Sequence, residues 1–133
     1  MRYVGGEWTA VSAPFGDSFE PGESPEQSAR RELAEECGFD APELELLGTL
    51  ISDTGRSENR LWCYLAARVS PLGADYVPEQ GVERILVPRA NLAELVTKAE
   101  FDHALHVAAL MLAVFKHGPE LLALRWSRPL AIL

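Results

Sequence analysis

The 133 residues of the chain are slightly fewer than the ~150 of an average domain, so we expect one domain over residues 1–133. Apolar residues make up 47% of the sequence and charged residues 24%, a balance that excludes an intrinsically disordered protein. Twelve Lys and Arg stand against 20 Asp and Glu, and the net charge of -8 would repel a phosphate backbone, which excludes polymeric nucleic acid as a partner.

The sequence shows no segment suited to a membrane or to export. The longest unbroken apolar run, residues 107–115, has nine residues, whereas a membrane span needs about 20. The first residues lack the apolar core of a signal peptide. Cys37 and Cys63 lie outside any Cys/His cluster of zinc-site spacing and are predicted to be reduced, packed thiols. We therefore expect a cytoplasmic protein without membrane attachment.

The first long element predicted is a helix from Pro25 to about Cys37. Ser24 is a typical N-cap, Pro25 suits the first helical position, and Gln27 completes a capping box. Helix-forming residues continue until Gly38, which can adopt the left-handed conformation that ends a helix. Before this helix, we expect one short strand near residues 7–12.

The helix is unusually acidic. At 100° per residue, Glu32, Glu35 and Glu36 share one face, and each like-charge pair is unfavourable by a few tenths of a kcal/mol. Two of them occupy the last turn, where the helix dipole disfavours anions. A hard divalent cation with oxygen ligands would reverse these terms. The pattern by itself indicates either a solvated acidic face or a metal site.

After the helix, strands are predicted over residues 44–51 and 61–69, joined by a polar loop over 52–60. A further strand over 82–87 is ended by Pro88, and a short helix over 89–98 follows. A second helix, over 102–116, is apolar almost all round and is expected in the core or in an interface. His103 and His106 lie on one face of it without a third metal ligand, so we expect a structural role for both.

The pattern E-x7-R-E-L-x-E-E-x-G-F begins at Glu23 and resembles the signature box of the Nudix hydrolases, GX5EX7REUXEEXGU. Six fixed identities at fixed spacing would arise by chance in on the order of one in ten million windows. One position differs, because the opening Gly of the box falls on Asp17, directly after Gly16.

This resemblance implies an α/β fold, a Nudix-type α/β/α sandwich with a mixed sheet and a metal-dependent diphosphatase site. The resemblance implies that Mg²⁺ or Mn²⁺ is bound by three carboxylates of the signature box and one backbone carbonyl. It also implies that an ion pair within the box braces the loop before the helix. Glu83 is a further candidate ligand or general base, with Glu79 as its substitute. The implied roles are metal binding by Glu32, Glu35, Glu36 and Gly16, catalysis by Glu35 and Glu83, and bracing of the loop by Glu23 and Arg31.

The layout after the box is similar to that of the ADP-ribose pyrophosphatase branch. The resemblance implies hydrolysis of ADP-ribose to AMP and ribose 5-phosphate, with Arg56 and Arg60 as substrate-binding candidates. A Pro that often marks this branch is here Thr54. The alternatives are a Nudix hydrolase for a nucleotide sugar, a dinucleotide or an oxidised nucleoside triphosphate, and a non-catalytic domain that binds a nucleotide.

We expect the N-terminal strands that usually precede such a box to be short or missing here. A sheet left incomplete exposes unpaired backbone groups and an apolar face, and both favour association with a second chain. We therefore expect a homodimer in which the helix over 102–116 or the apolar tail over 121–126 supplies the contact.

Overall fold

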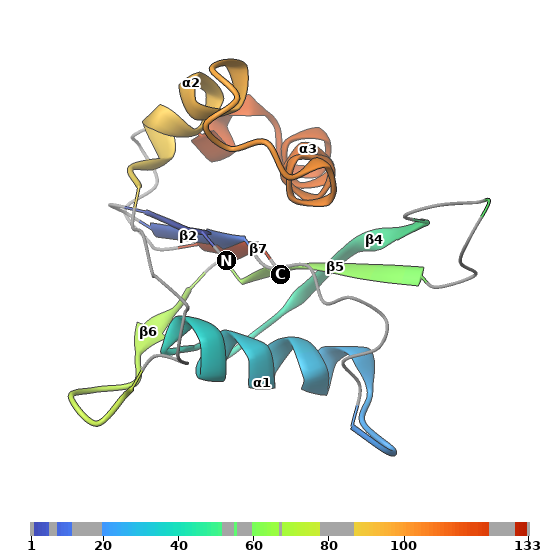
Figure 1. Cartoon of the computed structure of the whole chain (residues 1–133), viewed down its shortest axis with the longest axis vertical. Helices are drawn as coiled ribbons and strands as arrows, with labels where there is room; N and C mark the ends of the chain where they lie inside the picture. Colours follow the sequence, from blue (N-terminus) through green and yellow to red (C-terminus); the bar gives the residue numbers. More distant parts are fainter. Residues whose placement is uncertain are drawn as a thin grey trace.

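The computed structural model describes residues 2–5, 8–11, 20–51, 55, 60–66, 68–77, 87–122 and 130–132. The described part has three layers, in which a central sheet separates helix α1 (Pro25–Cys37) from helices α2 (Leu92–Thr97) and α3 (Ala104–His117) (Figure 1). This arrangement confirms the predicted α/β class. None of the described helices is long and apolar enough to cross a membrane.

Among the described residues, five strands form the main sheet in the order β1-β2-β7-β5-β4. Strand β1 (Arg2–Gly5) pairs with β2 (Trp8–Val11) in antiparallel fashion, whereas β2 and β7 (Leu130–Ile132) are parallel. Strand β5 (Arg60–Ala66) is antiparallel to both β7 and β4 (Glu45–Ile51). The sheet is therefore mixed, as expected.

The prediction of one strand before the acidic helix is wrong, because both β1 and β2 precede it. The two strands have four residues each, which is too short for an alternating pattern to stand out. The sheet is also continued by the end of the chain, since β7 lies between β2 and β5. A strand at residues 130–132 was not predicted from the sequence.

Strand β5 carries the core on both of its faces. Leu61, Cys63 and Leu65 pack with the cluster that α3 and residue Leu121 complete. The alternate positions Tyr64 and Ala66 pack with α1 and its neighbours. The period of two along β5 thus places one apolar set under α3 and the other under α1. Cys37 and Cys63 are both buried and form no disulfide, as predicted.

The two predicted C-terminal helices are present with adjusted ends. The first is divided into a 3-10 turn, η1 (Arg89–Asn91), and α2. Helix α3 buries Ala109, Leu110 and Ala113, whereas Phe115 is 82% exposed, so one face of this apolar helix is in the core. A second 3-10 turn, η2 (Pro119–Leu122), follows. The expected strand over 82–87 lies outside the described residues, apart from Val87.

His106 stacks on Phe101, with ring centroids 6.2 Å apart, and lies 4.2 Å from the ring of His103. Burial first, and then the neighbouring His103, lower the pKa of His106 to about 4. These contacts agree with the structural role expected for the two histidines.

Candidate functional site

Helix α1 has the predicted ends at both termini. The Gln27 backbone N–H donates to Ser24 Oγ at 3.2 Å, and the Ser24 N–H donates to Gln27 Oε1 at 2.8 Å, which completes the capping box. At the other end, Gly38 has a φ of 70° and its N–H donates to the Ala34 carbonyl at 3.0 Å. These local interactions determine where the acidic residues of α1 lie.

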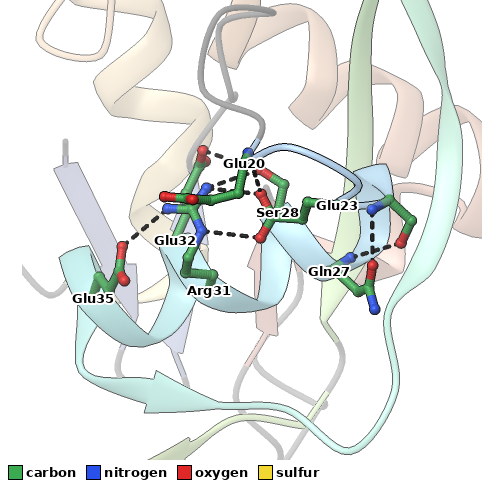
Figure 2. Close-up of polar contacts among 8 residues, drawn as sticks. Glu20, Glu23, Gln27, Ser28, Arg31, Glu32 and Glu35 are labelled. Atoms are coloured by element: carbon green, nitrogen blue, oxygen red, sulfur yellow. Dashed lines mark hydrogen bonds and ion pairs between the residues drawn. The ribbon is translucent and has the colours of Figure 1, made fainter.

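Arg31 is the centre of a polar network on α1 (Figure 2). Its Nε and Nη2 donate to the two carboxylate oxygens of Glu23, at 3.0 and 3.1 Å, in a bidentate pair. Its Nη1 donates to Glu35 Oε2 at 3.0 Å. The Arg31 guanidinium, together with the Glu20 backbone N–H, holds the pKa of Glu23 below its usual value. The residues before the helix are thus tied to Arg31 in its second turn.

Glu32 has the most unusual environment of the acidic residues on α1. The residue is 5% exposed, and Ser28 Oγ lies 3.4 Å from its Oε1. Burial, followed by repulsion from Glu36, raises the pKa of Glu32 to about 7. A carboxylate in this position is poorly solvated and lies close to a second negative charge, so its ionised form is favoured by any cation that reaches it.

The carboxylates expected to converge have different surroundings. The Glu35 side chain is 59% exposed and is directed to Arg31, whereas Glu36 is half-buried and acts electrostatically on Glu32. Within the described parts of the chain, no group of three or more His, Cys, Asp or Glu side chains is arranged to hold a metal ion. The structure therefore brings Glu32 and Glu36 together, and Glu35 with Arg31.

This pairing fits the coordination habits of magnesium. Mg²⁺ is commonly held by one or two carboxylates, with water and substrate phosphates completing its octahedron. A poorly solvated carboxylate beside a second one supplies donors of that chemistry, and Glu32 and Glu36 are such a pair.

Three of the predicted site residues, Gly16, Arg56 and Glu83, lie outside the described residues, as does Glu79. Arg60 is exposed at the start of β5, where it pairs in register with Ile51.

Tyr76 is a residue of this site that was not predicted from the sequence. Its hydroxyl lies 3.1 Å from the Glu35 carbonyl oxygen and 2.8 Å from that of Glu36. The same residue lines a cavity of about 530 Å³ with Ala34, Glu35, Leu72 and Val77. The contact joins residues 40 positions apart, and no local pattern around Tyr76 indicates it.

The bidentate geometry of Arg31 predicts that lysine cannot replace it. Arg31→Lys keeps the charge but loses the planar fork of donors, and we expect the free energy of unfolding to fall by about 1–2 kcal/mol. Chemical denaturation in the presence of a chelator measures this change.

Arg68→Lys is the matched control, because Arg68 makes a single 3.2 Å contact with Glu43 and both side chains are largely exposed. This variant should change the free energy of unfolding by less than about 0.5 kcal/mol. Equal effects of the two substitutions would contradict a special role of the Arg31 fork.

Comparison with known proteins agrees with the signature found in the sequence. The family model described as the NUDIX domain matches residues 2–110 of the chain. The chain is similar to ADP compounds hydrolase NudE of Escherichia coli (strain K12), with 29% identity over 93 residues. The aligned region covers 70% of this chain and 50% of that protein, so the chain spans about half the length of its curated relative. No match was found among solved structures.

Proposed function

Because the chain belongs to the Nudix family, we propose that it hydrolyses the diphosphate bond of a nucleoside diphosphate derivative. The first candidate substrate is ADP-ribose, which would give AMP and ribose 5-phosphate. The E. coli relative is an ADP compounds hydrolase, which supports an adenosine diphosphate derivative over other nucleotides.

The observation that carries this proposal is the environment of Glu32. A carboxylate that is 5% exposed and repelled by Glu36 is unfavourable in the metal-free protein. Such an arrangement is typical of a site whose electrostatics are completed by a cation and a phosphate ligand. A purely structural helix would gain stability from a neutral residue at this position, so the carboxylate is better explained by binding.

The proposed cofactor is Mg²⁺ or Mn²⁺, held by Glu32 and Glu36 with contributions from Glu35 and the Gly16 carbonyl. When bound, the cation would neutralise charge on the diphosphate and lower the pKa of a coordinated water. Arg31 would keep Glu23 and Glu35 in place, as its contacts at 3.0 and 3.1 Å support.

Glu35 and Glu83 are the proposed catalytic carboxylates. Glu35 is supported by its exposure and by its position on the wall of the 530 Å³ cavity. Arg56 and Arg60 are the proposed contacts of the substrate's phosphate or ribose, a role suited to forked donors.

A cytoplasmic location and a homodimer complete the proposal. The dimer is supported by exposed apolar side chains on two neighbouring elements, α3 and β4, which contact each other. Phe115 of α3 is 82% exposed and Leu46 of β4 is 41% exposed.

A panel of diphosphates with Mg²⁺, read by product chromatography, tests the substrate. We expect kcat/KM to be higher for ADP-ribose than for nucleoside triphosphates, with AMP as a product. Preference for a triphosphate, a nucleotide sugar or a dinucleotide by about tenfold would assign the chain to another substrate class. Binding of nucleotides without turnover of any of them would favour the non-catalytic alternative.

A further inference from the structure

The segment that follows β6 is fixed to the C-terminal end of α1. Strand β6 (Ser70–Pro71) pairs in antiparallel fashion with β3 (Phe39–Asp40), and β3 begins directly after the residue that ends α1. The Leu72 N–H then donates to the Gly38 carbonyl at 2.9 Å. The segment over residues 72–77 therefore starts beside the last turn of α1.

Tyr76 contacts the C-terminal end of α1 with both its ring and its hydroxyl. A Cβ atom placed on Gly38 would lie 2.5 Å from the ring carbons of Tyr76, so the aromatic ring occupies the space that only glycine leaves free. The hydroxyl lies 3.1 and 2.8 Å from the carbonyl oxygens of Glu35 and Glu36, and its single proton is shared between them.

These carbonyls belong to the turn that carries the proposed metal ligands. The last carbonyls of an α-helix lack donors within the helix and are satisfied by other groups or by water. The last turn of α1, all of which the structure describes, contains no basic residue. A Lys or Arg at this end would donate to the carbonyls, but its charge would also compete for the carboxylates. The tyrosine hydroxyl is a donor without that charge.

We propose that Tyr76 is a positioning residue for the acidic site. Its hydroxyl holds the last turn of α1, and with it Glu35 and Glu36, in the arrangement that binds a divalent cation. This inference rests on the proposed function, because it concerns the same carboxylates. Loss of the hydroxyl removes this donor from the two carbonyls and loosens the last turn, so that the carboxylates are placed less well for the cation.

The test compares Tyr76→Phe with Tyr64→Phe, which serves as the matched control. Tyr64 also packs in the cluster beside α1. The charged residue that acts on it is Glu26, which lies in the first turn of the helix and not in the last. Binding of Mn²⁺ alone is measured from the signal of free Mn²⁺ in electron paramagnetic resonance. The melting temperature of each sample is measured as well. The kinetic constants kcat and KM for ADP-ribose are then determined on the same samples at a temperature well below it.

We expect Tyr76→Phe to raise the dissociation constant of Mn²⁺ by about tenfold and to lower kcat by a similar factor. Its KM should change by less than about twofold, because the hydroxyl donates to the helix rather than to the ligand. Tyr64→Phe should keep the wild-type Mn²⁺ affinity and kcat, even where its melting temperature is lower.

Wild-type Mn²⁺ affinity and kcat in Tyr76→Phe would overturn the positioning role, whatever happens to the melting temperature. A rise in KM alone would also overturn it, and would assign Tyr76 to the adjoining cavity as a substrate contact. If the wild-type chain itself neither binds Mn²⁺ nor hydrolyses a diphosphate, the proposed function fails and this inference fails with it. The result for the wild-type chain thus separates the two failures.

Discussion

Glu32→Gln and Glu36→Gln are each expected to lower kcat with Mg²⁺ by at least about 10²-fold, while the fold is retained. Each substitution removes one carboxylate from the pair proposed to hold the cation, of which Glu32 is buried and Glu36 is half-buried. A loss of this size corresponds to about 2.7 kcal/mol of the activation barrier. The measurement is the turnover of ADP-ribose at saturating substrate, together with a circular dichroism spectrum of each variant.

Glu26→Gln provides the matched control for this series. It makes the same chemical change on the same helix, but Glu26 lies in the first turn and is half-exposed in an ion pair with Arg30. Its kcat should stay close to that of the wild type. Mg²⁺-dependent turnover that survives in Glu32→Gln or Glu36→Gln would end the assignment of these residues as ligands.

The ends of α1 could be predicted because they depend on neighbouring residues. The capping box of Ser24 and Gln27 and the left-handed Gly38 involve contacts over only a few positions, so the sequence pattern contains all of the information. The strands β4 and β5 were likewise predictable, since each has seven residues and most of them are apolar, aromatic or β-branched.

The shorter and more distant pairings could not be predicted in this way. Strand β7 has three residues, and its place in the sheet depends on parallel pairing with β2, more than a hundred residues earlier. The pair between β3 and β6 has two residues on each side and brings Tyr76 to the end of α1. Contacts of this kind arise from the assembled fold, and a local pattern contains no signal for them.

The acidic face shows the same limit within one helix. Glu32 and Glu35 are separated by less than one helical turn, so their spacing predicts the same role for both residues. In the folded chain, one is 5% exposed with its pKa raised to about 7, and the other pairs with Arg31 at the surface. Burial depends on which elements cover the helix, so their different character required the structure.

That difference predicts an opposite effect of substitution on the stability of the metal-free protein. Glu32→Gln should raise the free energy of unfolding at pH 8 by at most about 3 kcal/mol, because it removes a buried charge beside Glu36. Glu35→Gln should be neutral or slightly destabilising, since it removes an exposed ion pair with Arg31. Repulsion in the last turn alone would instead make both substitutions stabilising.

The dependence on pH identifies the carboxylate responsible. The carboxyl of Glu32 titrates near 4.5 in the unfolded chain and near 7 in the folded chain, so the folded state binds the extra proton between these values. The contribution of Glu32 to stability is thus fully present below pH 4.5 and is lost as the pH rises through 7. His106 acts in the opposite direction, because its pKa is lowered to about 4 and stability is lost as the pH falls below its unfolded value near 6.5.

The experiment therefore compares the variant with the wild type at each pH, so that the contribution of His106 cancels. In chelator, the melting temperature of Glu32→Gln should equal that of the wild type at about pH 4, where the Glu32 carboxyl is largely protonated in both the folded and the unfolded chain, and should exceed it at pH 8. Addition of Mg²⁺ at pH 8 should stabilise the wild type and narrow the difference, because bound cation favours the ionised carboxylate. A difference in melting temperature that is the same at both pH values would show that Glu32 is not the residue whose charge opposes folding.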